Sequence, residues 1–170
     1  MIAPWRPALL GFVGVAALAV AGGFLAGGGA SGGRNSIEFN HRKHVVENEI
    51  GCDTCHPFVA DETFSGLPDA DICSSCHAEA LGKSAEEAKL LALLAAGTPL
   101  EWKRLFRQPA HVFYSHRRHV AVARIECAVC HQDVGRSASP PTTVRKLRMD
   151  DCIACHQAKG VSANCTTCHR

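Results

Sequence analysis

The longest apolar stretch of the chain lies near its amino terminus. No charged residue occurs between Arg6 and Arg34, and Ala8 to Ala26 form an apolar run of 19 residues. About 20 residues in a helix cross the hydrocarbon of a bilayer, and the positive charge before the run places the amino terminus in the cytoplasm. The pattern predicts a single-pass anchor at residues 1–30 in the cytoplasmic membrane, with the remaining chain on the periplasmic side. A cleaved signal peptide is the alternative, because Gly28-Gly29-Ala30 fits a cleavage site.

A second helix is predicted at residues 85–96. Ser84 and Glu87 have the spacing of a capping box, in which Ser84 accepts from the first-turn amides and Glu87 reaches back. Gly97, with Pro99 beyond it, ends the pattern. The leucines of this segment are expected to pack on neighbouring parts of the molecule. We predict that this is the only long helix outside the anchor, because Gly, Pro and Cys interrupt the rest of the chain.

All ten cysteines of the 170-residue chain lie in one short motif, Cys-x-x-Cys-His. This pentad attaches c-type haem, because its two thiols form thioether bonds and its histidine becomes an axial ligand of the iron. Zinc ribbons do not require a histidine after every second cysteine, and disulfides within such pairs would close only tiny loops. We therefore predict five covalently attached c-type haems. The attachment residues are Cys52, Cys55, Cys73, Cys76, Cys127, Cys130, Cys152, Cys155, Cys165 and Cys168, and the proximal histidines are His56, His77, His131, His156 and His169.

The five histidines outside the pentads equal the number of predicted irons, so each iron can take a second, distal imidazole. These histidines are His41, His44, His111, His116 and His119. Side chains three residues apart on a helical turn share a face, with Cβ atoms about 5–6 Å apart, so one His-x-x-His pair can serve two neighbouring irons. His111 stands alone, and Met149 is its rival as a ligand. Such six-coordinate irons suit electron transfer, and we predict no catalytic residue.

An internal repeat with an offset of 75 organises these motifs. Residues 39–45 align with residues 114–120, and the pentads at Cys52 and Cys127 align as well. With about 27 exported residues per haem, a conventional core is not expected. We predict two repeated modules of short helices and loops wrapped around the haems, with little or no sheet. The predicted parts are the anchor at 1–30, a dihaem module at 31–83, a linker at 84–110 that holds the helix, and a trihaem module at 111–170.

The formal charge of +2 does not indicate a nucleic-acid-binding protein. Each haem carries two propionates, so five haems would add about ten negative charges. The basic residues are therefore expected to be propionate partners or solvated surface. Aromatic residues do not alternate with them, as they would on a nucleic-acid-binding surface. The residues concerned are Arg117, Arg118, Arg145, Lys146 and Arg148.

The aligned His-x-x-His and Cys-x-x-Cys-His units resemble those of the class III multihaem cytochromes c, which carry Phe-x-His-x-x-His before the first pentad. The resemblance implies that the first histidine of each pair serves the nearest haem and the second serves the next. The implied axial pairs are His41 with His56, His44 with His77, His116 with His131 and His119 with His156, which leaves His111 with His169.

A more specific resemblance covers residues 90–169, through the segments 97–102, 108–116 and 149–152. There the chain is similar to the membrane-anchored multihaem subunit of alternative complex III and of menaquinone reductase. The resemblance implies quinone-binding membrane subunits and an iron–sulfur/molybdopterin-like subunit as partners, with other cytochromes as electron partners.

Together these patterns predict a membrane-anchored pentahaem cytochrome that relays electrons in a quinone-linked respiratory complex. Two alternatives stay open. Cleavage after the amino-terminal segment would release a free periplasmic electron shuttle. A multihaem reductase of a small oxyanion or nitrogen compound would need one iron with an open position, which the ligand count allows only if His111 does not bind.

Overall fold

The computed structural model describes residues 34–169 of the chain. The chain divides into two units, Met1–Gly32 and Gly33–Arg170, and the second unit holds all the described residues. The predicted membrane helix at residues 1–30 lies outside them. Within residues 34–169, no helix is both long enough and apolar enough to cross a membrane.

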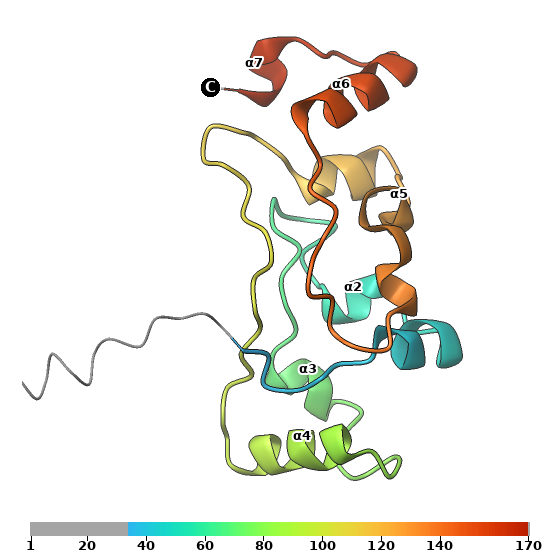
Figure 1. Ribbon diagram of the computed structural model, residues 1–170, viewed down its shortest axis with the longest axis vertical. Helices are drawn as coiled ribbons and strands as arrows, with labels where there is room; N and C mark the ends of the chain where they lie inside the picture. Colours follow the sequence, from blue (N-terminus) through green and yellow to red (C-terminus); the bar gives the residue numbers. More distant parts are fainter. Residues whose placement is uncertain (1–33, 170) are drawn as a thin grey trace, which may run out of the picture. The chain divides into compact units, whose positions relative to one another are not determined.

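Short helices joined by extended segments form the described unit (Figure 1). Among these residues the only strand-like pairing is an isolated antiparallel bridge between Val112 and His169. The prediction of short helices and loops with little or no sheet is therefore confirmed. The elements are η1 (Arg42–Glu47), α2 (Cys52–Cys55), α3 (Ala70–Ser74), α4 (Ala85–Ala95), η2 (Arg118–Val122), α5 (Cys127–His131), η3 (Gln132–Arg136), α6 (Met149–Ala158) and α7 (Cys165–Cys168).

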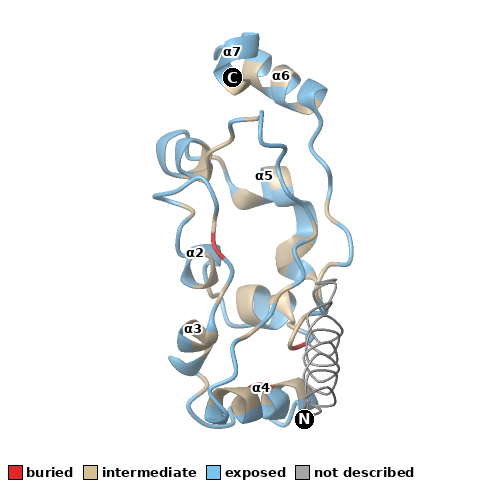
Figure 2. Cartoon of the chain, turned by 90° about the vertical axis from the view of Figure 1, so that its left-hand side faces the viewer, coloured by how far each residue is buried: buried red, intermediate tan, exposed pale blue. Residues whose placement is uncertain are grey.

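Very few side chains of this unit are buried by protein alone. Ile37 and Leu90 are the only buried hydrophobic residues that the structure describes, each about 5% exposed, and most of the ribbon is exposed or half-buried (Figure 2). Domains of ordinary composition bury most of their apolar side chains. Packing between side chains therefore does not form a conventional core here, as the small number of residues per predicted haem led us to expect.

Helix α4 agrees with the helix predicted at residues 85–96. Its end is a left-handed turn at Gly97, where φ is +61° and the amide donates to the carbonyl oxygen of Leu94. Only glycine adopts this conformation without a Cβ penalty, which explains why the helix ends there. The predicted capping box is wrong, because Ser84 makes no side-chain cap hydrogen bond. The carboxylate of Glu87 instead accepts from the amides of Leu81 and Gly82.

Helix α6, with ten residues, is almost as long as α4, so the expectation of a single long helix is also wrong. The helix begins where the Asp151 carboxylate accepts from the Arg148 amide at 2.8 Å, while Arg145 pairs with the same carboxylate at 3.0 Å. This acidic residue in the first turn also suits the positive end of the helix dipole. The pentad that begins at Cys152 therefore lies within a regular helix.

The two copies of the sequence repeat have the same local structure. Both His-x-x-His segments enter a π-helix, η1 in the first copy and η2 in the second, rather than an α-helical turn. The residue that follows each π-helix by two positions, Glu49 or Arg124, has a left-handed φ of 54° or 52°. The amide after it then donates to a histidine carbonyl at 3.0 Å in each copy, from Ile50 to His44 and from Ile125 to His119.

The copies also contact each other in a reciprocal way. The amide of Arg42 donates to the carbonyl of Ser137 at 2.9 Å, and the amide of Arg117 donates to the carbonyl of Glu62 at 3.1 Å. Arg42 and Arg117 are equivalent positions of the repeat, 75 residues apart, and so are Glu62 and Ser137. The first copy therefore donates to the second in one contact and accepts from it in the other. Such exchange of equivalent contacts is what a two-fold axis produces in a dimer. The described unit therefore contains a local two-fold relation between residues of one chain.

Candidate functional site

Each aromatic residue that precedes a His-x-x-His pair positions both imidazoles of that pair. The Phe39 ring stacks on His44 with centroids 4.4 Å apart and meets His41 edge-on at 4.8 Å. Tyr114 makes the same two contacts, at 4.7 Å with His119 and 5.0 Å with His116. In each pair, one imidazole therefore stacks on the aromatic ring and the other meets it edge-on.

Each distal candidate lies opposite a pentad histidine. Ring centroids are 6.2 Å apart for His44 and His77, 6.3 Å for His116 and His131, and 6.2 Å for His119 and His156. His111 and His169 are closer, at 5.7 Å. His41 interacts with His56, because burial, then His56 and then His44 lower the pKa of His41. The structure thus brings together the histidine pairs that the resemblance to class III multihaem cytochromes c implied.

This spacing fits a metal held between two imidazoles. Metal–nitrogen bonds of about 2 Å on both sides of one ion place the ring centroids roughly 6 Å apart. The described residues contain no cluster of three or more His, Cys, Asp or Glu side chains that would hold a bare metal ion. The arrangement suits an iron that receives its four equatorial ligands from a porphyrin and only two ligands from the protein.

Hydrogen bonds at Nδ1 orient most of these imidazoles. Seven of the ten histidines have Nδ1 within hydrogen-bond distance of an oxygen that can only accept, so Nδ1 carries the proton and Nε2 is free to bind a metal. Outer partners of this kind fix the ring orientation of metal-bound histidines. The acceptors are Asn40 for His44, Gly66 for His56, Glu87 for His77, Thr63 for His116, Ser115 for His119, Ser162 for His156 and His111 for His169.

One of these contacts, and a further contact of His41 with a hydroxyl, cross between the copies of the repeat. Nδ1 of His116 lies 2.8 Å from the carbonyl of Thr63, and Nδ1 of His41 lies 3.3 Å from the hydroxyl of Ser137. Sequence reasoning missed both partners, because they are 53 and 96 positions from the histidines they hold. No local pattern marks them, and only the folded chain brings them together.

Neighbouring thiols connect the attachment motifs. Burial and then the nearby Cys127 raise the pKa of Cys52. Burial, followed by Cys55 and Asp69, raises the pKa of Cys73 to about 11. The pKa of Cys130 is raised by burial and by the nearby Cys155.

The last two motifs continue this series. Burial and then the nearby Cys168 raise the pKa of Cys152. These interactions between thiols place the pentads in one spatial order. The order begins at the Cys73 pentad and continues with those of Cys52, Cys127, Cys152 and Cys165. The helices that hold them succeed one another in the same order in Figures 1 and 2, from α3 through α2 and α5 to α6 and α7.

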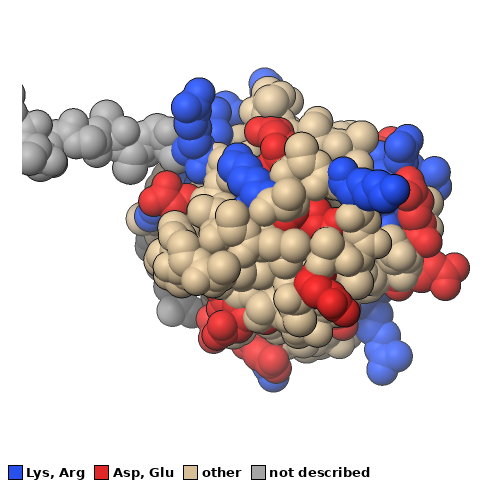
Figure 3. All heavy atoms as spheres, turned by 90° about the horizontal axis from the view of Figure 1, so that it is seen from below, with Lys and Arg blue, Asp and Glu red and all other residues tan. Residues whose placement is uncertain are grey.

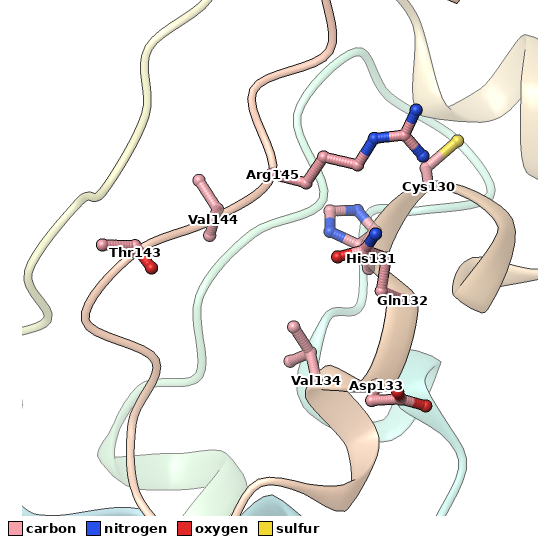
Figure 4. A pocket seen from close by; sticks show the side chains of 8 residues that line it. All are labelled: Cys130, His131, Gln132, Asp133, Val134, Thr143, Val144 and Arg145. Carbon is pink, nitrogen blue, oxygen red and sulfur yellow. The ribbon is translucent and has the colours of Figure 1, made fainter.

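A small pocket of about 130 Å³ borders the attachment motif at Cys130 and His131. Residues 130–134 line one side, and Thr143, Val144 and Arg145 line the other (Figure 4). The guanidinium of Arg145 points toward Cys130, and its charge opposes the rise in the pKa of that thiol. The sequence predicted Arg145 as a propionate partner or solvated surface, and in this structure it pairs with Asp151 at 3.0 Å.

Comparison with known proteins agrees with this geometry. Residues 112–170 match the family described as cytochrome c7 and related cytochrome c. The multihaem cytochrome c subunit of menaquinone reductase from Nitratidesulfovibrio vulgaris is 32% identical over 159 aligned residues, which cover 79% of this chain and 76% of the relative. Both findings confirm the resemblance read from the pentads. The chain is an electron-transfer protein with covalently attached haem, and it belongs to the multihaem c-type cytochromes related to this subunit.

Proposed function

We propose that the chain is a membrane-anchored pentahaem cytochrome that relays electrons within a quinone-linked respiratory complex. The observation that carries this proposal is the pairing of each pentad histidine with one histidine outside the pentads. A haem bound at such a site supplies reversible one-electron chemistry. Five pentads and five histidine pairs give five sites, with the attachment cysteines and the axial histidines that the sequence predicted.

The histidine arrangement supports a relay rather than a reductase. A reductase needs an iron with one open position, and His111 is the residue whose absence from the iron would create one. The His111 ring lies 5.7 Å from that of His169, while its rival Met149 is 61% exposed at the start of α6. We therefore assign His111 as the distal ligand at the Cys165/Cys168 site. Two imidazoles on each iron leave no position for a substrate.

The order of the attachment motifs supports a single path through the protein. The series of neighbouring thiols runs from the Cys73/Cys76 site, through the Cys52/Cys55 and Cys127/Cys130 sites, to the Cys152/Cys155 and Cys165/Cys168 sites. We propose that electrons pass along this series, so that the two ends of the path are the Cys73/Cys76 site beside α4 and the Cys165/Cys168 site in α7.

The partners follow from the relative and from the amino-terminal pattern. The relative is named as a menaquinone reductase subunit. We propose that this chain likewise assembles with quinone-binding membrane subunits and an iron–sulfur/molybdopterin-like subunit, and exchanges electrons with other cytochromes. The apolar run at residues 8–26 would anchor the haem domain on the periplasmic side of the cytoplasmic membrane.

Three measurements test this proposal. The mass of the purified protein and its haemochrome spectrum should give five haems per chain, and electron paramagnetic resonance should show low-spin irons. Extraction from membranes should yield the chain together with quinone-binding subunits. A substantial high-spin signal would contradict a relay in which every iron has two axial histidines. Amino-terminal sequencing that finds a cleaved segment, with the chain free in the periplasm, would favour the shuttle.

A further inference from the structure

The His77 site of the first copy and the His156 site of the second correspond as the second pentads of the two copies, and they differ in the group that accepts from Nδ1. Nδ1 of His156 donates to the carbonyl oxygen of Ser162 at 2.7 Å, which is a neutral acceptor. Nδ1 of His77 donates to Oε1 of Glu87 at 3.0 Å. Among the histidines that the structure describes, His77 is the one whose Nδ1 partner is a carboxylate.

The Glu87 carboxylate is firmly held in this contact. Oε1 also accepts from the amide of Leu81 at 2.8 Å, and Oε2 accepts from the amide of Gly82 at 2.9 Å. The side chains of His77 and Glu87 are only 20% and 11% exposed. Water therefore screens this pair less than it would screen a surface pair. The spacing to Ser84 suggested a helix cap, but the structure assigns Glu87 to the imidazole.

A carboxylate that accepts from a metal-bound histidine makes the imidazole a stronger electron donor. A stronger donor stabilises ferric iron more than ferrous iron, and the negative charge of the carboxylate acts in the same direction. A neutral carbonyl oxygen makes the imidazole a weaker electron donor than a carboxylate does, and it adds no negative charge.

We propose that Glu87 sets the reduction potential of the haem bound at Cys73 and Cys76 below that of the haem bound at Cys152 and Cys155. The inference rests on the proposed function, because it needs His77 as an axial ligand. Glu87 is then a positioning residue that acts through His77. Because the Cys73/Cys76 site is one end of the series, the carboxylate favours electron flow from that end toward the carboxyl-terminal sites.

The test is a stepwise redox titration of the full-length protein, with each haem followed by the nuclear magnetic resonance of its methyl protons. In the unmodified protein, the Cys73/Cys76 haem should become reduced at lower potential than the Cys152/Cys155 haem. Glu87→Gln should move the Cys73/Cys76 midpoint to higher potential, since the amide oxygen is a neutral acceptor. The other four midpoints should move less.

Glu86→Gln is the matched control. It removes the same charge one residue away, from a side chain that accepts from the Glu38 amide and pairs with Lys89 but contacts no histidine. Charges of both signs are interspersed on this face of the molecule, which Figure 3 shows from the α4 end. Removal of one of them should therefore move all the midpoints only slightly.

The outcomes separate this inference from the proposed function. Haem count and low-spin spectra report on the proposed ligands and do not depend on Glu87. If those hold and Glu87→Gln shifts the midpoint no more than Glu86→Gln, or if the two wild-type midpoints have the opposite order, the inference is overturned. If Glu87→Gln does not fold, the order of the two midpoint potentials in the wild-type protein decides the question by itself.

Discussion

The side chains of Cys52 and Cys127, 75 positions apart, lie close enough to interact. Each is the first cysteine of the first pentad in its copy of the repeat. A residue that contacts its own equivalent lies on the two-fold axis. The histidines that follow them, His56 and His131, are also close enough to interact. The first attachment sites of the two copies therefore meet at the axis, and the remaining sites extend outward from this junction.

This junction makes the Cys52/Cys55 site essential for passage between the copies. Cys52→Ala with Cys55→Ala should remove one haem and separate the Cys73/Cys76 site from the other three. Electron transfer from the Cys73/Cys76 haem to the Cys127/Cys130 haem should then fall by orders of magnitude, which pulse radiolysis or protein-film voltammetry can measure. Cys165→Ala with Cys168→Ala is the control, because it removes a terminal site and leaves four neighbours. An equal loss of electron-transfer rate in both variants would refute the proposed order of the sites.

His111 and Met149 can be distinguished by substitution. His111→Ala should convert about one fifth of the iron to a high-spin form, because the Cys165/Cys168 site loses its distal imidazole. Met149→Leu should leave the spectrum unchanged, since the His111 ring, 5.7 Å from that of His169, lies at that site. Electron paramagnetic resonance of the oxidised proteins reads both results. A high-spin signal in the Met149 variant instead would reassign the ligand.

Gly66→Ala should destabilise the protein strongly. A Cβ at this position would lie 2.8 Å from Cδ2 of Phe58, and φ is +81°. Overpacking and a left-handed alanine together should cost about 2–4 kcal/mol of unfolding free energy. Gly160→Ala has a similar φ of +65° but open space around the Cβ, so it should cost only about 1 kcal/mol. Denaturant unfolding measures the loss of stability in both variants. Similar losses would show that the Phe58 ring moves aside.

Glu49→Gly and Arg124→Gly should each stabilise the protein. Both residues have a left-handed φ, which is unfavourable for side chains larger than glycine. The expected gain is about 0.5–1 kcal/mol of unfolding free energy, after the greater flexibility of glycine in the unfolded chain is included. Glu126→Gly, at a φ of −63°, should destabilise. A loss of stability in all three variants would mean that the turns carry no strain.

The contribution of Asp151 to stability should depend on pH. The amide of Arg148, and then the cations Arg145 and Arg148, hold the pKa of this carboxyl below its ordinary value of 3.8. The folded state therefore binds fewer protons than the unfolded state in this range. The stability difference between wild type and Asp151→Asn should be complete above about pH 4 and disappear as the pH falls through the folded pKa. A difference that persists at the lowest pH would exclude this mechanism.

Local patterns were enough to predict the candidate sites of this chain. Each pentad contains its own cysteines and proximal histidine, and α4 ends where Gly97 requires it. The comparisons confirm the cytochrome family. The pentads and the end of α4 could be read from the sequence because the atoms involved are close along the chain. The histidine pairs, whose members lie 15 to 58 positions apart, rested on the resemblance to class III multihaem cytochromes c.

Only the tertiary structure decided which distant residues complete each site. Thr63 holds His116, Ser137 holds His41, and Cys52 meets Cys127 across the local axis. For Glu87 the sequence suggested a helix cap, yet the carboxylate reaches His77 because the turn at Leu81 and Gly82 brings them together. Such contacts have no periodicity along the chain. They arise when segments pack side by side, and that packing depends on the whole molecule rather than on any one motif.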